Sequence, residues 1–321
     1  MAVKRKEPAA DGRRAQEQPS HTGGRKPTLS IIGAGRLGTA LAIALSRCGY
    51  RVEAVVARRL GHARRAASLV QGGTLALTAK QLALLPPTDL LFITTPDDVL
   101  LSSARELAAT VSVDSRQRHT ALHTSGALSS TVLSPLREAG FRVGSMHPLI
   151  SVSDPLSGAE SLREAFYCVE GDASAVRAAR VVVRSLGGQS FSINTRDKAL
   201  YHAAAVMSSG HVVALMDITI EMLVRCGLTR RSARRVLMPL LRSTIENLSA
   251  HDPAHALTGT FARADAATVQ RHLAALRQLA PRDALAAYVL LGRRSVQLAK
   301  IKGAHRSELE RILQALKDSE A

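Results

Sequence analysis

The sequence predicts an α/β domain with a parallel sheet, followed by an all-α domain. From Thr28 onward, short apolar runs alternate with Ala- and Leu-rich segments, which is typical of a parallel sheet covered by helices. After Asn194 no β-rich run follows, and long segments of Ala, Leu and Arg fill the chain. The 321 residues suffice for two domains of about 150 residues each. We therefore expect a disordered basic tail over 1–27, a sheet domain over 28–194 and a helical domain over 195–321.

The strands of the first domain are predicted where short apolar runs are bounded by turn residues. Their ranges are Thr28–Ile32, Arg51–Ala57, Asp89–Thr95, Thr120–His123, Arg142–Met146, Ala165–Val169 and Gln189–Ile193. A helix of Ala and Leu follows the first strand and ends at Arg47, before Gly49. A second helix over Ala173–Leu186 joins the last two strands into one β-α-β unit.

The helices of the second domain are predicted from its long Ala, Leu and Arg segments. They cover Lys198–Cys226, Thr229–Leu248, Asp265–Leu279, Arg282–Ile301 and Glu308–Lys317. Gly227 is expected to end the first of them, and Thr229 to cap the next. The most apolar window, Ala203–Val224, holds one imidazole and two carboxylates. We interpret that window as a buried helix rather than a membrane span.

A glycine motif at the end of the first strand predicts dinucleotide binding. The motif G-x-G-x-x-G follows a strand and opens a helix, and its glycines permit a tight turn, a close approach to a pyrophosphate and close helix–strand packing. Free N–H groups at the helix N-terminus then bind the anion. The predicted binding turn consists of Gly33, Ala34, Gly35, Arg36, Leu37 and Gly38. The alternative is a Rossmann-type domain that no longer binds a nucleotide.

The end of the second strand predicts NADP rather than NAD. NAD-specific sites place an acidic residue there to bind the ribose hydroxyls, whereas this chain has Ala57 followed by Arg58 and Arg59. Two guanidinium groups suit a 2′-phosphate better than a diol. Glu53 lies too early in the strand to replace the acidic residue. The alternative is that Arg58 and Arg59 are simply two of the 35 arginines in the chain.

The basic charge of the chain is spread along its length. Lys and Arg number 43 and Asp and Glu 26, a formal net charge of +17. The excess is +4 in 1–27, +5 in 28–194 and +8 in 195–321. Aromatic residues, which stack on bases, make up only 3%. We interpret most of the excess as arginine on solvated helix faces, against the alternative of a nucleic-acid role for the tail.

The cysteines and the N-terminal sequence predict the compartment. Cys48, Cys168 and Cys226 are odd in number, far apart and without metal-ligand spacing, which indicates a reducing environment and no metal site. Residues 1–27 contain no apolar stretch, so they are neither a signal peptide nor a membrane anchor. We therefore expect a cytoplasmic protein without a membrane partner.

Several segments together resemble one bacterial family. They include IIGAGRLGTALA, TTPDDV, HTSGALSS, SMHPLISV, ALYHAAAVMSSGHVVAL and LTGTFARADAATVQRHLAAL. Over residues 28–280 the chain resembles candidate oxidoreductases that join a Rossmann-like domain to a domain of unknown function 2520. More distantly it is similar to the 6-phosphogluconate-dehydrogenase-like superfamily, which includes pyrroline-5-carboxylate reductase, ketopantoate reductase and prephenate dehydrogenase. The resemblance implies a homodimer formed by the helical domain and an active site in the cleft between the domains.

Polar residues follow three strands of the sheet at their carboxyl ends, where open α/β sheets bind ligands. The segment of Thr94, Thr95 and Pro96 resembles the one that lines the nicotinamide in this superfamily. Ser125 and His147 follow the next two strands, and a hydroxyl and an imidazole there suit the proton transfer that accompanies hydride transfer. The pair also resembles a serine and a histidine of prephenate dehydrogenase that contact the substrate hydroxyl.

Each catalytic candidate has a structural alternative. Ser125 has the alternative of a helix cap, and His147 that of an orienting residue before Pro148. His123 is interpreted as a buried structural histidine. His202, on the first long helix, is the third catalytic candidate, and its alternative is a core or interface histidine.

Two further residues bear on mechanism and substrate. β-Hydroxyacid dehydrogenases carry a catalytic lysine on the first long helix, but Val206 falls near that position and Lys198 lies two turns earlier. A lysine mechanism is therefore not supported, and His147 is the better proton carrier. Arg263 precedes Asp265, a predicted helix cap, and is a candidate for binding a carboxylate or phosphate of the substrate. The alternative is a surface arginine.

These features predict an NADP-dependent oxidoreductase that acts on a small, anionic substrate with a C=O, C–OH or C=N group. Residues 28–194 would bind NADP, and residues 195–321 would supply the dimer interface and substrate contacts. The competing hypothesis is a nonenzymatic NADPH-binding sensor or regulatory protein.

Overall fold

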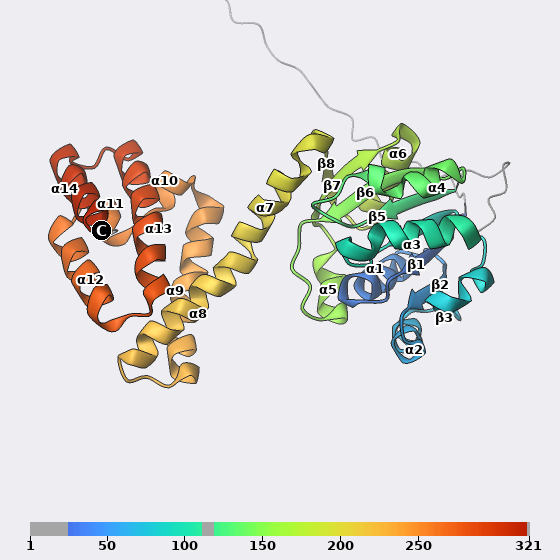
Figure 1. Cartoon of the computed structure of the whole chain (residues 1–321), viewed down its shortest axis with the longest axis horizontal. Coiled ribbons are helices and arrows are strands. Elements are labelled where there is room, and N and C mark those ends of the chain that lie inside the picture. The colour runs from blue at the N-terminus through green and yellow to red at the C-terminus, as the bar shows by residue number, and fades with distance from the viewer. Residues whose placement is uncertain (1–24, 111–118, 320–321) are drawn as a thin grey trace, which may run out of the picture. The chain divides into compact units, whose positions relative to one another are not determined.

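The computed structural model describes residues 25–110 and 119–319, and the chain divides into two compact units, Met1–His202 and Ala203–Ala321 (Figure 1). The predicted disordered tail over 1–27 lies outside the described residues except for its last three. The division falls inside helix α7 (Lys198–Ser208), shortly after the boundary that the sequence predicts at Asn194. That boundary stays a prediction.

The first unit is built on a sheet that has eight strands within the described part of the chain, in the order β3-β2-β1-β4-β5-β6-β7-β8. The strands are β1 (Leu29–Ile32), β2 (Val52–Ala57), β3 (Leu75–Thr78), β4 (Leu90–Ile93), β5 (Thr120–His123), β6 (Arg142–Pro148), β7 (Phe166–Gly171) and β8 (Gln189–Phe191). The strand order reverses at β1, which pairs with both β2 and β4. Open α/β sheets bind their ligands at such a switch point.

Two of the described strands, β7 and β8, run opposite to the other strands of the sheet. Neighbouring strands are parallel except β6 and β7, which are antiparallel with His147 opposite Cys168. Helix α5 (Pro155–Ser161) lies in the connection between them and packs against α1, where Gly158 meets Ala40. The chain thus stays near the end of the sheet where β6 stops and enters β7 from that end. The final β7-α6-β8 unit is parallel, as predicted.

Hydrophobic cores cover both faces of the sheet. Leu29 and Ile31 of β1 belong to the core that includes α1 (Arg36–Arg47) and α6 (Ala173–Ser185). Ile32 belongs to the other core, with α3 (Asp97–Thr110), because side chains alternate between faces along a strand. The remaining elements of this unit are α2 (Leu60–Ser68), α4 (Ser134–Glu138) and the 3-10 helices η1 (Ala79–Leu84), η2 (Ser130–Leu133) and η3 (Thr195–Asp197).

The second unit is helical throughout its described residues, as the sequence predicts (Figure 1). Its helices are α8 (Gly210–Arg225), α9 (Arg230–Ala250), α10 (Pro253–Ala256), α11 (Gly259–Ala262), α12 (Ala266–Leu279), α13 (Arg282–Ile301) and α14 (Arg306–Lys317). Helices α12, α13 and α14 form most of its core. Thr229 and Asp265 cap α9 and α12 with their side-chain oxygens, which confirms both predicted caps.

The apolar window Ala203–Val224 is helical but not buried, which corrects the prediction. The stretch Thr195–Arg225 is long and apolar enough to cross a membrane by length and composition alone, and none of its most apolar window is buried within the chain. Helix α8 packs mainly on α9, and α9 buries only Ala233. Helix α13 makes a smaller contact with α8, and much of the rest of α8 is left exposed by the described residues, with Val213 71% exposed.

Candidate active site

A cavity of about 880 Å³ opens where β1, β2 and β4 end. The glycine turn after β1, the end of β2 with the start of α2, the segment from β4 into α3, and the first residues after β5 line it. Its volume lies within the range of ligand sites in proteins, roughly 300–1,000 Å³. The cavity therefore occupies the switch point at which a sheet of this order binds ligands.

Two glycines of the turn are required by contacts inside the protein. Gly33 has a φ of +109°, and a Cβ there would lie 2.8 Å from the backbone carbon of Thr94. A Cβ on Gly38 would collide with the carbonyl oxygen of Gly33 and the hydroxyl of Thr94. Both positions exclude every side chain, so α1 begins in direct contact with the ends of β1 and β4. This is the close packing predicted for the third glycine.

Gly35 is open toward the cavity. A Cβ on Gly35 would meet no atom within 4 Å, and the residue lines the cavity. Gly35 is also the N-cap of α1, a helix that no side chain of the described residues caps. The N–H groups of the first turn are thus left to a ligand, and they favour an anion. Open space before an uncapped helix N-terminus fits the pyrophosphate of a dinucleotide.

The end of β2 brings basic side chains to the cavity. Arg58 lines the cavity, and so does His62 in the first turn of α2, a residue that the sequence analysis did not select. Arg59 is the N-cap of α2 and is not among the described residues that line the cavity. Glu53 pairs with Arg51 at 2.9 Å and does not line the cavity either. The guanidinium of Arg58 suits a phosphate better than a diol.

The segment after β4 contributes Thr94, Thr95 and Pro96 to the cavity wall. Thr94 Oγ1 donates a hydrogen bond of 2.6 Å to the carbonyl oxygen of Gly33, which ties this segment to the glycine turn. Thr95 Oγ1 is buried and has no hydrogen-bond partner among the described residues. Buried hydroxyls are normally paired, so the Thr95 hydroxyl is a group that a bound ligand can satisfy.

The Ser125 hydroxyl has three partners. Oγ accepts hydrogen bonds from the N–H groups of Ala127 at 3.2 Å and Leu128 at 3.0 Å, and it donates to Asp97 Oδ2 at 2.9 Å. Ser125 therefore shapes its own turn, in line with the capping alternative, while it also lines the cavity together with Asp97. A hydroxyl has one proton to donate, and here that proton points at Asp97.

His147 is held by Tyr201, which lies on α7. The Nδ1 atom of His147 is 2.7 Å from the Tyr201 hydroxyl. Burial, with help from His202 and Lys198, lowers the pKa of His147 to about 4, so the ring is neutral at pH 7. Burial also raises the pKa of Tyr201, so its hydroxyl keeps its proton. We assign Tyr201 as the donor and Nδ1 as the acceptor of this hydrogen bond. We assign the proton of the neutral His147 ring to Nε2 on this basis.

His202 stands edge-on to His147. The ring centroids are 5.6 Å apart and the ring planes cross at 84°. Both rings lie against Gly126, where a Cβ would lie 2.8 Å from His147 Nε2 and would collide with His202 Cδ2. Gly126 follows Ser125 directly. The structure thus brings the three predicted catalytic residues, Ser125, His147 and His202, together around one glycine.

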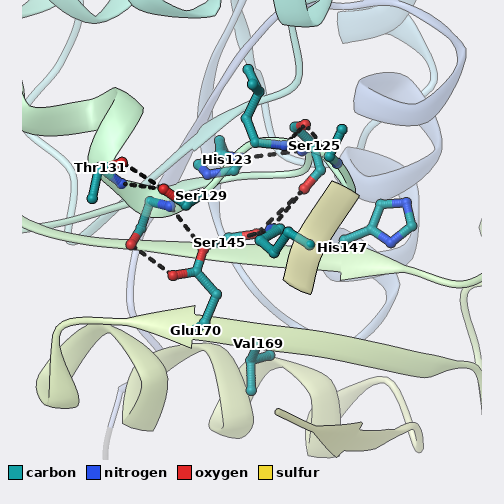
Figure 2. A network of polar contacts seen from close by, with 12 residues as sticks. His123, Ser125, Ser129, Thr131, Ser145, His147, Val169 and Glu170 are labelled. Atoms are coloured by element: carbon teal, nitrogen blue, oxygen red, sulfur yellow. Dashed lines mark hydrogen bonds and ion pairs between the residues drawn. The ribbon is translucent and has the colours of Figure 1, made fainter. Parts of the chain in front are cut away.

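A buried ion pair adjoins this group (Figure 2). Lys198 is 1% exposed and Glu170 6% exposed, with Nζ 3.5 Å from Oε1. Lys198 Nζ also donates to the carbonyl oxygen of Ser125 at 3.1 Å and to Ser145 Oγ at 2.6 Å. Glu170 accepts hydrogen bonds from the N–H and the hydroxyl of Ser130, both at 2.8 Å. Figure 2 shows the Glu170 side chain reaching from β7 toward the loop that carries Ser129.

Other candidates lie apart from the cavity wall. Arg36 is not among the described residues that line it. Arg263 lies in the second unit, at the C-cap of α11, and its substrate role stays a prediction. His123 is fully buried and its Nδ1 accepts a hydrogen bond from the Ser125 N–H at 3.1 Å. Burial lowers the pKa of His123 to about 3, in line with its interpretation as a structural histidine.

Sequence reasoning missed several partners of the site. Asp97 directly follows the predicted nicotinamide segment, so its place after a strand end was a signal. Tyr201 lies three residues after Lys198, which puts both on one face of a helix. Glu170 had no local signal, because its partners lie 40 residues before and 28 after it in the sequence.

Two families match the chain. The Rossmann-like domain family matches residues 16–148, and the family called domain of unknown function 2520 matches residues 165–295. Between them the matches cover most of both predicted domains. No curated protein matches this sequence.

Solved structures share the fold. Protein TM1727 from Thermotoga maritima is 20% identical, with a TM-score of 0.66, over 85% of this chain and 99% of that chain. The candidate NADP oxidoreductase BF3122 from Bacteroides fragilis is 21% identical, with a TM-score of 0.63, over 86% and 97%. A variant imine reductase from Myxococcus stipitatus, in complex with NAD+, is 19% identical, with a TM-score of 0.54, over 91% and 99%. At these identities the likeness establishes the fold.

Proposed function

We propose that this chain, which joins a Rossmann-like domain to a domain of unknown function 2520, is an NADP-dependent oxidoreductase. Its substrate is small and anionic and carries a C=O, C–OH or C=N group. One observation carries the proposal: a continuous cavity runs from Arg58, past the glycine turn, to Ser125. One end of that cavity suits a phosphate. The other ends at Ser125, and His147 and His202 are not among the described lining residues but pack against the next residue, Gly126. The nicotinamide cofactors named for BF3122 and the imine reductase agree with it.

Different segments of the first unit would hold different parts of NADP. Arg58, with His62 from the first turn of α2, would bind the 2′-phosphate. The turn from Gly33 to Gly38 would bind the pyrophosphate through its N–H groups. Thr94–Pro96 would line the nicotinamide, where the Thr95 hydroxyl lacks a partner among the described residues. NADP in its reduced form supplies a hydride to the substrate carbon.

His147 is the proposed proton carrier. Its Nε2–H polarises the substrate oxygen or nitrogen, and the proton passes to that atom as the carbon gains the hydride. Nδ1 takes the hydroxyl proton of Tyr201 in the same step, so the ring stays neutral, and solvent then returns a proton to Tyr201. Tyr201 donates to Nδ1 and thereby keeps the proton of the neutral ring on Nε2. The use of a neutral imidazole as a donor is an established strategy for carbonyl chemistry. His202 and Ser125 complete the group around Gly126, and Ser125 holds Asp97 by its hydroxyl proton.

Arg263 is proposed to bind the anionic group of the substrate. Its side chain is exposed, and the backbone around it is fixed by the positive φ of Ala264 (52°) and the Asp265 cap. A guanidinium on a fixed turn can bind a carboxylate or phosphate with two parallel hydrogen bonds.

A second copy of the chain is proposed to cover the apolar surface of α8 and α9. Val213 of α8 is 71% exposed, and Val236, Leu240 and Leu248 of α9 are 52%, 65% and 50% exposed. The three α9 residues recur at multiples of four, so they share one face of that helix. Contiguous exposed apolar surface of this kind marks an interaction site, and a homodimer is the occupant that the family resemblance implies.

A substrate screen at saturating NADPH tests the proposed activity. Small keto acids, hydroxy acids and cyclic imines are each offered with NADPH or NADP+, and absorbance at the nicotinamide band is followed. We expect one class to be turned over, with His147→Ala reducing kcat at least 100-fold and leaving NADPH affinity within twofold. Tight NADPH binding without turnover of any class would favour the competing hypothesis, a nonenzymatic NADPH sensor.

A further inference from the structure

One buried ion pair holds the loop between β5 and η2 by hydrogen bonds at both of its ends. Lys198 Nζ donates to the Ser125 carbonyl oxygen, at the beginning of the loop. Glu170 accepts from the N–H and the hydroxyl of Ser130, at its end. Nζ and Glu170 Oε1 are 3.5 Å apart. The short segment between these ends carries Ser125 and Gly126, the residues on which the candidate catalytic group is assembled.

The lysine has no donor left for a substrate. An ammonium group has three N–H donors, and three acceptors surround Nζ: the Ser125 carbonyl oxygen, Ser145 Oγ and Glu170 Oε1. With 1% exposure, Lys198 also lacks access to a ligand. The lysine therefore acts through other residues and not on the substrate itself.

Stability alone does not account for the pair. Two charges taken out of water lose much of their hydration, and buried ion pairs are often no more stabilising than apolar residues of the same volume. The Lys198–Glu170 pair instead has a specific geometry, because its two members hold a loop and the strands β6 and β7 at fixed points. Buried charges kept for such reasons specify one arrangement of the chain around them.

The same lysine also fixes the helix that holds His147. Lys198 is the first residue of α7, and Tyr201 and His202 follow it by three and four positions, on the same helix face. Tyr201 binds His147 Nδ1, and the His202 ring packs on His147. Anchoring the start of α7 to Ser125 and Ser145 therefore sets where these two rings meet His147.

We propose that Lys198 and Glu170 form a positioning pair that sets the geometry of Ser125, Gly126 and His147. This role rests on the proposed function for its effect on turnover, but its effect on His147 can be measured without turnover. The groups that face His147 are Tyr201 and His202 on α7 and Cys168 opposite it on β7, and Lys198 acts on it by charge. The Lys198 ammonium disfavours a second positive charge on His147.

Three variants of the full-length chain test the pair. Lys198→Met and Glu170→Gln each leave one buried charge without its partner, so both are expected to melt at lower temperature than the parent. The double variant, K198M with E170Q, removes both charges and is expected to recover most of that loss. Lys300→Met, at an exposed lysine of α13, is the control for loss of one positive charge.

The decisive readouts are made on the double variant. We expect NADPH affinity within twofold of the parent and kcat at least tenfold lower with KM within threefold. The His147 pKa, followed by NMR of the ring, should rise from its low value, because burial is the largest cause of that value and a ring that is no longer held in place is less buried. A double variant with the kcat and the His147 titration of the parent would overturn the positioning role. If the parent turns nothing over, a raised His147 pKa still supports the pair, and the failure then belongs to the proposed activity alone.

Discussion

Arg58 and Arg59 are adjacent in sequence but differ in their relation to the cavity. Arg58 lines it, whereas Arg59 caps α2 and is not among the described lining residues. We predict that Arg58→Ala lowers the preference for NADPH over NADH at least tenfold, because a 2′-phosphate loses a charge-assisted partner. Arg59→Ala, the matched control, should change the preference less than threefold. Fluorescence titration with both cofactors measures the preference. If Arg58→Ala and the parent showed equal preference, Arg58 would have no role in binding the 2′-phosphate.

His123 makes the stability of the protein depend on pH. Its pKa is lowered by burial to about 3 in the folded chain, against about 6.5 when unfolded. Between these values the unfolded state binds more protons, so stability is full above pH 6.5 and falls as the pH drops toward 3. His147, with a pKa of about 4, acts in the same direction.

Melting temperatures between pH 7.5 and 4.5 measure this effect. His123→Asn keeps an oxygen that can accept from the Ser125 N–H but does not titrate. We predict a flatter dependence in His123→Asn than in the parent. The control is His305→Asn at an exposed position, which should keep the parent slope. Parallel curves for the parent and His123→Asn would refute the linkage.

At the scale of elements, the glycine turn gives two opposite predictions from similar substitutions. Gly35→Ala places a methyl in open space, so the melting temperature should change by less than about 2 °C while NADPH affinity falls at least tenfold. Gly38→Ala drives a Cβ into the Gly33 carbonyl and the Thr94 hydroxyl, so that variant should lose stability by more than about 1 kcal/mol. Equal effects of both variants on melting would contradict the division of roles within the turn.

The elements that sequence predicted well are those with local signals. The strand Thr120–His123 and the helix Arg282–Ile301 coincide with β5 and α13, because apolar runs and turn residues mark their ends. The sheet is mostly parallel, as predicted, but the reversed direction of β7 and β8 was not foreseen. Strand direction depends on where α5 packs and not on the residues of the strand. The strand β3 (Leu75–Thr78), at the sheet edge, was missed because its four residues are too few for a clear pattern.

The residues of the candidate site likewise include some that local sequence signals predicted and others that they did not. Ser125, His147 and the residues from Thr94 to Pro96 were predicted because polar groups at strand ends meet at one edge of a parallel sheet. The sequence did not support a catalytic role for Lys198. The structure agrees with that interpretation, because all three N–H donors of Lys198 face acceptors within the chain. The pairing of Lys198 with Glu170 depends on long-range packing of α7 against β7 and carries no spacing signal.

At the scale of the whole molecule, the exposed apolar face of α8 and α9 predicts self-association. Leu240→Glu puts a charge at a 65% exposed apolar position and should shift the chain from dimer to monomer, because an interface does not tolerate a buried unpaired charge. Analytical ultracentrifugation at micromolar concentration measures the mass. The matched control is Leu313→Glu, at a 41% exposed leucine of α14, which should leave the dimer intact. A parent chain that sediments as a monomer would remove the homodimer from the proposed function.

At this scale, several parts of the molecule contribute to the net charge of +17. The segment 1–27 carries +4 and lies almost wholly outside the described residues. Lys198 pairs with Glu170 inside the protein, and Arg58 lines the cavity. Much of the remainder is arginine on exposed helix positions, as on α9, whose arginines are all exposed. This agrees with the interpretation of the charge as arginine on solvated helix faces.

Transfer of deuterium from NADPH labelled at the nicotinamide C4 tests the central claim most directly. The parent chain is incubated with labelled NADPH and the panel of keto acids and imines. The molecular masses of the products are then measured by mass spectrometry. An NADP-dependent oxidoreductase predicts one product that gains a single deuterium on the former C=O or C=N carbon, with the yield reduced at least 100-fold in His147→Ala. Saturable binding of NADPH with no label in any product would contradict the claim.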